Sequence, residues 1–547
     1  MTADMTSSRV RVPTRSALLL GLASGFVAQA IWSAGYGFDL APFPPFDAAD
    51  LFIRFAPGNV ATWGIETFGH TAQQIILAGG IALWLALGSA IGAVTRAAPG
   101  KRSRALTLIA YISLALVCAL ANASLPHGGR RVVALAILVA GSSVATLLLH
   151  SWVIRRAEIA SQEAEARATS SNWLAAAGDI DRRSFLQHVA GTTLLIASSG
   201  LALGWLGRRA GAGAVVTAAD TDLADARAAA ELAGELPPLP LPAPAGPFPD
   251  QFDAPPDVRP RFTPTADFYV VDISTRDPAI PERGWALRVH GRVERELAVD
   301  WPTLLSMPAV EQFGTLMCIS YTHGSDLIST TRWTGVPLRD VLQQSGIGSG
   351  VVDVVLRGAH GYSDSIPLAT ALDPATLLAY GMNGRTLPRQ HGFPCRVIIP
   401  GLYGEKNVKW LDEIELVDFD YLGYWQERGW TDIAIVNTLS TIDTPRLDVF
   451  RDAGGVVPVG GIAFAGDRGI ARVELSVDGG DWMETLLEPY NPAAVWQRWR
   501  YDWMPAPGQY RLTVRATDGV GHVQPDTDRP PHPDGQTGLY RTSITVF

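Results

Sequence analysis

The chain has 547 residues, and its 44 basic against 53 acidic side chains give a formal net charge of −9 at pH 7. This acidic balance argues against a protein that binds nucleic acid, and the sequence has no basic patch interleaved with aromatic residues. With three cysteines in all, the chain can build neither a disulfide framework nor a four-cysteine zinc or iron–sulfur site.

Residues 1–210 are predicted to be a helical membrane region. About five apolar stretches reach or approach the length that crosses a bilayer: 16–36, 72–95, 105–125, 132–153 and a shorter one at 189–207. The charged content of 18% and the mean hydropathy of +0.14 agree with an integral membrane protein.

The basic residues predict the orientation of these spans. They concentrate at 9–15, 96–104 and 155–183, which five crossings place on one side of the membrane. Because positive residues favour the cytoplasmic side, we expect the N-terminus inside and everything after the fifth span outside. The sequence therefore predicts a multi-pass protein of the cytoplasmic membrane whose C-terminal part is extracytoplasmic.

An Arg-Arg-x-Phe-Leu sequence stands just before the fifth stretch, in DRRSFLQHVAG (181–191). It resembles a twin-arginine export signal placed inside the chain, a route that accepts cargo already folded around a cofactor. The alternative is that Arg182 and Arg183 only anchor the topology.

Four histidines lie at the predicted span ends: His70, His127, His150 and His188. Pairs at equal depth can ligate haem b, but histidines are ordinary at membrane interfaces and the chain has no Cys-x-x-Cys-His for a covalent haem. We therefore expect this region to be an anchor.

A linker is predicted over 211–260. It is Ala-rich and then Pro-rich, as in LPPLPLPAPAGPFPDQFDAPPDVRP (236–260), and prolines at this density favour an extended tether. The remaining chain is long enough for two cores, predicted as a cofactor domain at 261–437 and a β module at 438–547.

Cys318 lies in TLMCISYTHGSDLISTTRWTGVPLRDVL (315–342), after an apolar lead-in and before a small polar loop. That setting suits a thiolate that ligates a metal. Because the protein supplies so few other cysteines, such a thiolate must work together with a ligand that the protein does not supply.

The segment HGFPCRVIIPGLYGEKNVKWL (391–411) predicts a buried strand at 396–399, a Gly-rich loop and a basic tip. Gly401 and Gly404 let backbone N–H groups approach an oxyanion, and Arg396, Lys406 and Lys409 can donate charge-assisted hydrogen bonds. The loop therefore predicts a phosphate site.

The last hundred residues predict a separate all-β module. ARVELSVDGGDWMETLL (471–487) and YRLTVRATDG (510–519) alternate apolar and polar residues, as strands with one buried face do. This pattern is typical of an immunoglobulin-like sandwich. Trp496, Trp499 and Trp503 are predicted to pack in its core or interfaces.

Together with RGAHGYSDSIPLATALDPATLLAYGMNGRTLPRQ (357–390), the Cys318 and Gly-rich segments resemble the molybdopterin domain of the sulfite oxidase family, an α+β fold. The resemblance implies that Cys318 completes the coordination of a molybdenum held by a pterin dithiolene. It places Tyr362 beside the metal's oxo group. The residues that match the family's pterin-phosphate segment are His391, Arg396, Asn407, Val408 and Lys409.

The C-terminal module is similar to the family's immunoglobulin-like domain, which commonly pairs two subunits. Arg468 matches an arginine that reaches the metal pocket and attracts the substrate anion. Departures from the family pattern are Thr265, Val270 and His360, together with Ile319, Ser320, Tyr321 and Thr322, where an Asn is usual near the Cys.

The resemblance implies oxygen-atom transfer at an oxo-molybdenum centre, with a small oxyanion such as sulfite as substrate and an external cytochrome or quinone-linked carrier for the electrons. One alternative is the reverse chemistry, reduction of an S-oxide such as methionine sulfoxide. A second alternative is a non-catalytic binding or structural module that retains the fold.

Overall fold

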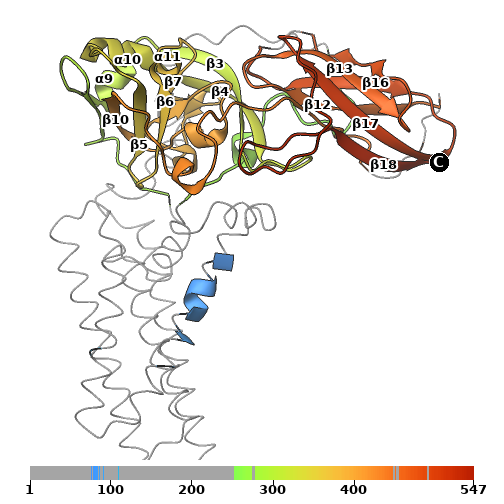
Figure 1. Ribbon diagram of the computed structural model, residues 1–547, viewed down its shortest axis with the longest axis horizontal. Coiled ribbons are helices and arrows are strands. Elements are labelled where there is room, and N and C mark those ends of the chain that lie inside the picture. The colour runs from blue at the N-terminus through green and yellow to red at the C-terminus, as the bar shows by residue number, and fades with distance from the viewer. Residues whose placement is uncertain are drawn as a thin grey trace, which may run out of the picture. The chain divides into compact units, whose positions relative to one another are not determined.

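A computed structural model describes residues 252–547, apart from 274–276, 447–449, 451–454 and 490–491, together with scattered residues between 75 and 109. Figure 1 draws these residues as ribbons. The predicted spans fall almost wholly outside the described residues, as do the twin-arginine segment and the four histidines. Among the residues that are described, no helix is long and apolar enough to cross a bilayer.

Two sheets build the part of the predicted cofactor domain that is described, here called the cofactor lobe. The first sheet has the strand order β2-β1-β10-β5-β6, and within it β1 and β10 run parallel. Its strands are β1 (Ala286–Gly291), β2 (Leu297–Asp300), β5 (Asp353–Gly358), β6 (Ser363–Pro367) and β10 (Leu411–Val417).

The second sheet is antiparallel, with the order β3-β4-β7-β8, and β9 pairs with Leu377–Ala379 of β7. Its strands are β3 (Val310–Met317), β4 (Ile328–Pro337), β7 (Leu377–Met382), β8 (Arg385–Thr386) and β9 (Arg396–Ile398). The predicted buried strand at 396–399 is therefore present as β9, and all of its residues are buried.

Short helices complete the cofactor lobe: α9 (Trp301–Ser306), α10 (Leu338–Ser345) and α11 (Leu368–Ala371). Helix α9 begins where the Asp300 carboxylate accepts a hydrogen bond from the backbone N–H of Thr303 at 3.0 Å. Helix α10 buries one apolar face and ends at Gly346, whose φ of 70° favours glycine. The cofactor lobe is predicted to be α+β. In the described residues it consists mainly of strands, with a few short helices.

The C-terminal residues form two packed antiparallel sheets, here called the sandwich lobe. One has the order β11-β12-β16-β15 and the other β14-β13-β17-β18. The strands are β11 (Leu439–Ser440), β12 (Val457–Phe464), β13 (Ile470–Val477), β14 (Met483–Glu484), β15 (Leu486–Leu487), β16 (Gln497–Trp503), β17 (Gly508–Asp518) and β18 (Tyr540–Val546).

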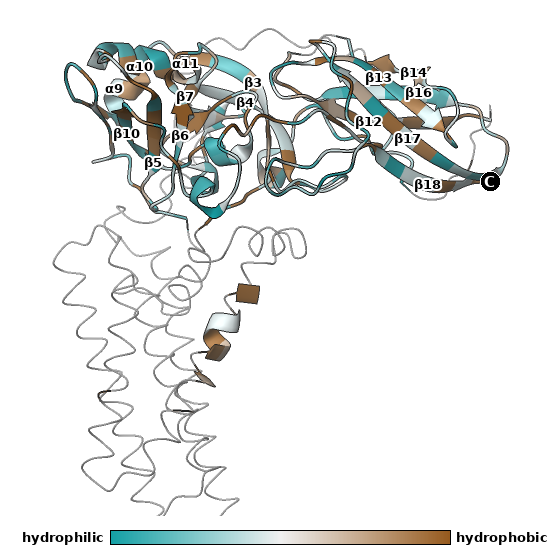
Figure 2. Ribbon diagram, in the orientation of Figure 1, coloured by the Kyte–Doolittle hydropathy of each residue, from teal (hydrophilic) through white to brown (hydrophobic). Residues whose placement is uncertain are grey.

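The apolar residues of the alternation predicted from the sequence fill a core in this lobe. Val473 and Leu475 of β13 lie in the same sheet as Leu512 and Val514 of the neighbouring strand β17, and all four are fully buried in one core with Trp499. Figure 2 shows apolar and polar residues alternating along these strands. Two packed sheets are therefore present where the sequence predicts them, while the immunoglobulin-like assignment and pairing with a second subunit stay predictions.

The two lobes share a second core. Met317, Cys318 and Ile319 lie in one cluster of buried residues with Ile462, Phe464 and Trp496 of the sandwich lobe. The backbone N–H of Trp496 donates to the hydroxyl of Thr315 at 3.0 Å, and that of Thr315 donates to the carbonyl of Ala494 at 2.8 Å. The sandwich lobe therefore supports the strand end that carries Cys318.

Candidate active site

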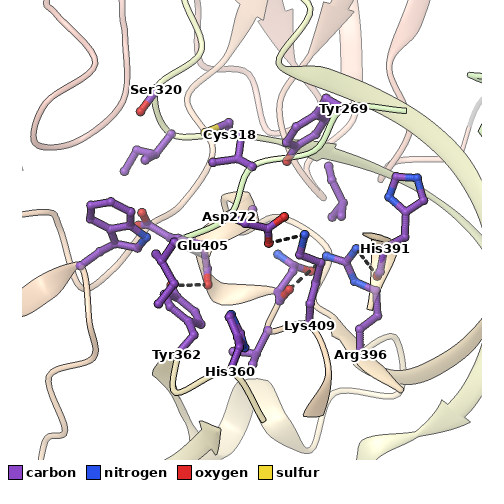
Figure 3. A pocket seen from close by; sticks show the side chains of 18 of the residues that line it. Tyr269, Asp272, Cys318, Ser320, His360, Tyr362, His391, Arg396, Glu405 and Lys409 are labelled. Carbon is purple, nitrogen blue, oxygen red and sulfur yellow. Dashed lines mark hydrogen bonds and ion pairs between the residues drawn. The ribbon is translucent and has the colours of Figure 1, made fainter. Parts of the chain in front are cut away.

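A cavity lies where the end of β3, the loop after β5, the segment before β1 and the turn after β9 meet (Figure 3). Its empty volume, including the space at the open mouth, is about 820 Å³. The structure brings most of the predicted site residues to its wall: Cys318, Tyr362, His391, Arg396, Gly404, Asn407, Val408 and Lys409.

Cys318 is the first residue after β3 and is 9% exposed. Its backbone N–H donates to the carbonyl of Leu327 at 3.0 Å, and its carbonyl accepts from the N–H of Tyr321 at 3.0 Å. Burial raises the pKa of the thiol to about 11. The site therefore offers a fixed sulfur whose thiolate form requires a cation beside it.

Arg396 and Asn407 hold the basic side of the cavity in place. The Arg396 guanidinium donates through Nη1 to the carbonyl of His391 and through Nη2 to that of Asn407, both at 3.0 Å. The Asn407 side chain accepts from the N–H of Ile399 at 2.7 Å and donates to the carbonyl of Tyr403 at 3.0 Å. These bonds tie β9 to the turn that follows it.

One donor of this arginine remains unused. The buried Nε of Arg396 has no hydrogen-bond partner among the residues that the structure describes. Burial lowers the pKa of Arg396 to about 10, yet the group stays charged at neutral pH. A buried cation with a spare donor suits an anionic ligand in this cavity.

Lys409 reaches the same region from the other end of the turn. Its ammonium pairs with Asp272 at 2.5 Å and donates to the carbonyl of Gln390 at 3.0 Å. Burial lowers the pKa of Lys409 and raises that of Asp272 to about 6. The Asp272 carboxylate thus orients Lys409. The sequence analysis did not predict this contact.

His391 is 1% exposed and lies at the end of the short 3₁₀ helix η3 (Arg389–His391). Burial lowers the pKa of His391 to about 3, and the positive charges of Lys409 and Arg396 add to that effect. The ring is therefore neutral at physiological pH and can exchange a hydrogen bond without adding charge.

Lys406, which the sequence groups with the phosphate donors, points elsewhere. It lies in the 3₁₀ turn η4 (Gly404–Lys406), and its ammonium contacts Asp364 at 2.8 Å and Asp432 at 2.9 Å. Gly404 does line the cavity, and a Cβ at this position would lie 2.5 Å from the hydroxyl of Tyr269. The turn therefore needs glycine next to the cavity.

Arg468 is not among the residues that line the cavity. Its Nε pairs with Asp518 of β17 at 2.9 Å, and its Nη2 donates to the carbonyl of Val436 at 3.0 Å. The predicted substrate role of this arginine stays a prediction, and in this structure Arg468 ties the junction of the lobes to the sandwich lobe.

Tyr362 contributes a hydroxyl that has two acceptors within reach. It donates to Asp364 Oδ2 at 3.0 Å or to the carbonyl of Glu405 at 2.8 Å. A phenol has one hydrogen, so the acceptor lone pairs of the oxygen remain for other partners. Burial raises the pKa of Tyr362 well above its usual range, so the phenol keeps its proton at neutral pH.

The departures from the family pattern lie in and around the same region. His360 lines the cavity between the rings of Trp410 and Tyr362, with centroids 4.6 Å and 5.9 Å away. The hydroxyl of Thr265 accepts from the amide of Asn383 at 3.1 Å, and that of Tyr321 accepts from the N–H of Gly324 at 3.3 Å. Local contacts thus accommodate these three departures.

Several residues that line the cavity were not predicted from the sequence: Tyr269, Asp272, Glu405, Trp425 and Trp430. The segment 262–272 carries the first two, and sequence spacing does not show that it folds over the end of β3. Glu405 stands inside the phosphate loop, where a carboxylate is not an expected lining group. The tryptophans follow β10 and gave no periodic signal.

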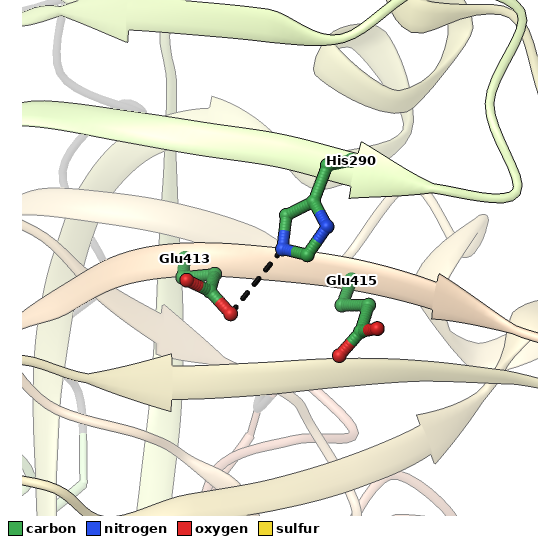
Figure 4. Close-up of side chains that lie close together, drawn as sticks. All are labelled: His290, Glu413 and Glu415. Carbon is green, nitrogen blue, oxygen red and sulfur yellow. Dashed lines mark ion pairs between the residues drawn. The ribbon is translucent and has the colours of Figure 1, made fainter.

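A second group of metal-ligand types lies on the first sheet (Figure 4), where His290 Nε2 is 3.2 Å from Glu413 Oε1 and Glu415 lies beside it. Arg357 already pairs with Glu413 at 3.1 Å and with Glu415 at 2.7 Å. Because an arginine occupies both carboxylates, the group is an ion-pair network on the sheet surface.

The cavity fits a group that has a soft metal on one side and a phosphate on another. Figure 3 shows Cys318 and the basic side chains of Arg396 and Lys409 on different sides of the cavity. The thiol suits a soft metal, and the guanidinium with its spare Nε suits a phosphate.

Comparisons with known proteins agree with this geometry. Residues 274–425 match the model of the oxidoreductase molybdopterin binding domain family. Human mitochondrial sulfite oxidase is 36% identical over 238 residues, which cover 37% of this chain and 44% of that protein. The NADH nitrate reductase of Volvox carteri is 30% identical over 310 residues, which cover 45% and 36%.

Among solved structures, the sulfane dehydrogenase SoxCD of Paracoccus pantotrophus aligns with a TM-score of 0.47 and 20% identity over 55% of this chain and 89% of that one. The chain spans less than half the length of the human and Volvox relatives.

These findings define the class: the chain contains the molybdopterin-binding domain of an oxidoreductase enzyme. More particularly, the domain is related to those of sulfite oxidases and nitrate reductases. Its cofactor is molybdenum–molybdopterin, so the predicted enzyme class and cofactor are both confirmed.

Proposed function

We propose that the protein transfers an oxygen atom between water and a small oxyanion, in the manner of a sulfite oxidase, and passes the electrons to an external carrier. The observation that carries this proposal is that Cys318 and the anion-binding pair of Arg396 and Lys409 line one cavity. The human relative is a sulfite oxidase, which favours a sulfur oxyanion as the substrate.

When bound, the molybdenum–molybdopterin group supplies the exchange of an oxygen atom and of two electrons. The chain's own residues bind and orient it. Cys318 would hold the metal, since a thiolate is a soft ligand and the fold presents it at the cavity wall. Arg396 and Lys409 would hold the phosphate through charge-assisted hydrogen bonds, and His391 would add a neutral partner.

The surrounding walls control water and polarity. Trp425 and Trp430 line the cavity with large apolar surfaces, which limits the number of waters beside the reacting groups. The low local dielectric strengthens the attraction between the buried cations and an anionic substrate or phosphate. Glu405 completes the wall, and burial raises its pKa well above its usual range.

Reduction is the second candidate. The Volvox relative is a nitrate reductase, so a related domain also occurs in an enzyme named for the reductive direction. Reduction of an S-oxide such as methionine sulfoxide needs the same cavity and the opposite flow of electrons. The third hypothesis, a module without turnover, is disfavoured because Cys318 and most of the predicted cradle converge on one cavity.

A dye assay separates these functions. The full chain, purified from a molybdenum-replete host, is given sulfite with an oxidising dye, and separately methionine sulfoxide or nitrate with a reduced viologen. The proposal predicts turnover with sulfite and little with the other two substrates. Turnover only with a reduced dye would select the reductive candidate. Full molybdenum content without turnover of any of these substrates would reject both the oxidative and the reductive candidate.

We also propose that the enzyme is a multi-pass protein of the cytoplasmic membrane with its catalytic part outside. The five apolar stretches and the distribution of basic residues support this orientation. Arg182 and Arg183 would then direct export of the folded domain. The resemblance to the sulfite oxidase family also leads us to expect a homodimer formed through the sandwich lobe.

A further inference from the structure

A continuous chain of buried polar groups leads away from the cavity. The Tyr362 hydroxyl lies 3.0 Å from Asp364 Oδ2, and Asp364 Oδ1 accepts from the Lys406 ammonium at 2.8 Å. The same ammonium donates to Asp432 Oδ1 at 2.9 Å. The side chains of Asp364, Lys406 and Asp432 are 0%, 2% and 42% exposed, so the chain runs from the cavity wall to solvent.

We propose that Tyr362, Asp364 and Lys406 form a proton path that connects the cofactor cavity with solvent at Asp432. The inference rests on the proposed function, because a water molecule that gives its oxygen to a substrate must release two protons. None of the four groups is needed to hold the cofactor, since the cradle is formed by Arg396, Asn407 and Lys409.

The transfer balances without any redox change. The Tyr362 oxygen accepts a proton from the cavity through a free lone pair while its own O–H proton passes to Asp364 Oδ2. The Lys406 ammonium gives one proton to Asp432, the Asp364 carboxyl group turns so that its protonated oxygen faces Lys406, and the neutral amine then takes that proton. Asp432 then releases its proton to water. One proton enters from the cavity, one leaves to solvent, and every group returns to its starting state.

A purely structural role accounts poorly for this network. Removing a carboxylate and an ammonium from water costs several kcal/mol per ion, and apolar residues of similar volume often replace such pairs without loss of stability. Burial raises the pKa of Asp364 even though the Lys406 charge opposes the shift. A carboxylate whose proton affinity is increased, and which is hydrogen-bonded on both sides, is suited to accept a proton and pass it on.

The other groups that face Asp364 do not break the path. The backbone N–H of Ser365 donates to Asp364 Oδ1 at 2.8 Å, and the carbonyl of Ser365 accepts from Lys406 at 3.0 Å. The carbonyl of Glu405 is the alternative acceptor of the single Tyr362 hydroxyl proton, and the path uses the orientation in which that proton points to Asp364 Oδ2. The buried carboxyl of Glu405 and the phenol of Tyr424 contribute to the field around Tyr362. These contacts fix the positions of the Tyr362, Asp364 and Lys406 side chains, and the Asp432 side chain remains partly exposed to water.

The discriminating variant is Lys406→Arg in the full chain. Arginine keeps the positive charge and can pair with both carboxylates, but it does not release its proton in proteins. A structural ion pair predicts that Lys406→Arg behaves like the parent. The proton path predicts that kcat for sulfite falls on the order of 10²-fold, with KM and molybdenum content unchanged and a larger solvent deuterium isotope effect. The isosteric Asp364→Asn should behave in the same way.

A matched control is Asp443→Asn, which removes a buried, ion-paired carboxylate outside the path. It should keep the kcat, KM and isotope effect of the parent. An equal fall of kcat in this control would assign the loss to a general disturbance, and the proton path would be rejected.

A second measurement needs no turnover and separates this inference from the proposed function. In the cofactor-free full chain, infrared spectroscopy after a rapid drop in pH follows the carboxylic acid band that Asp364→Asn abolishes. The path predicts that this band appears at least tenfold more slowly in Lys406→Arg than in the parent. A band that never titrates, or one that appears equally fast in both proteins, would overturn the path whatever the substrate is.

Discussion

At the scale of single residues, burial pushes the groups around the cavity toward their neutral forms. It lowers the pKa of Arg396 to about 10 and that of His391 to about 3, and it raises those of Asp272 to about 6 and Cys318 to about 11. The common cause is the loss of water around the charged form. A ligand that brings both a metal cation and an anionic phosphate compensates these groups, which is what molybdenum–molybdopterin carries.

The neutral state of His391 has a consequence for stability. Its pKa is about 3 in the folded chain and about 6.5 when unfolded, so between these values the unfolded chain binds more protons. The contribution of His391 to the free energy of unfolding is therefore fully present above about pH 6.5, and it falls as the pH drops toward 3. In the cofactor-depleted full chain, we expect the melting temperature to drop between pH 7 and pH 5 by less in His391→Gln than in the parent.

The control for this prediction is His522→Gln, because the side chain of His522 is 79% exposed. This variant should keep the pH dependence of the parent. Equal drops in the parent and in His391→Gln would show that another group carries the acid sensitivity.

At the scale of elements, strand β9 and the turn after it form the phosphate cradle. Each charge-assisted hydrogen bond contributes about 1.5–3 kcal/mol, so Arg396→Ala or Lys409→Ala should weaken molybdopterin retention roughly 10- to 100-fold. Molybdopterin per protein, measured by fluorescence of the oxidised pterin, tests this.

Arg389→Ala is the matched control. Arg389 lies in η3 beside the cradle, is not among the cavity-lining residues, and donates to the carbonyl of Pro278 at 3.0 Å. Its loss should leave pterin content unchanged. Full occupancy in Arg396→Ala and Lys409→Ala would contradict the role given to this strand and turn.

The same turn shows how far sequence can predict a site. Gly-rich spacing and three nearby cations predicted a phosphate site, and two of these cations, Arg396 and Lys409, line one cavity. The predicted buried strand is present as β9. Spacing could not show that the 3₁₀ turn sends Lys406 to one side and Lys409 to the other. Asp272 and Tyr269 come from far along the chain, so only tertiary packing reveals them.

Regular periodicity predicted the sandwich lobe better than the cofactor lobe. Strand β17 alternates over Leu512–Ala516 between buried apolar residues and less buried polar ones, and this alternation follows directly from one buried face. The position of Arg468 depends instead on a tertiary contact with Asp518, which no pattern in the sequence indicates.

At the scale of the whole molecule, the core shared by the two lobes should couple the sandwich lobe to the cofactor. Ile462 packs in the cluster that contains Cys318, whereas Leu475 packs in the core between the two sandwich sheets. Both are fully buried, so truncation to alanine should cost about 2–5 kcal/mol in either case.

Only Ile462→Ala should also reduce molybdenum retention, because it loosens the support of the strand end that carries Cys318. Thermal melts compare the stability loss of Ile462→Ala and Leu475→Ala, and elemental analysis compares their metal content. If Ile462→Ala and Leu475→Ala lose equal stability and also equal amounts of molybdenum, the shared core has no specific role in metal retention.

The proposed topology is testable without reference to family. A reporter that is active only outside the cytoplasm should work after Phe547 and fail within residues 96–104. Changing Arg182 and Arg183 together to Lys keeps the charge that topology needs but removes the guanidinium pair, so it should retain the reporter inside. Export of this double variant would reduce the pair to a topology anchor, and a silent reporter after Phe547 would reject five crossings.

The central claim is that Cys318 ligates molybdenum in the cavity, and X-ray absorption at the molybdenum edge tests it most directly. In Cys318→Ser, a hard hydroxyl replaces a soft thiolate, so any metal that remains should have one sulfur neighbour fewer than in the parent. Cys395→Ser serves as the control, because Cys395 is fully buried and is not among the cavity-lining residues. It should keep the metal content and the sulfur shell of the parent. The same sulfur shell in Cys318→Ser and in the parent would contradict the account.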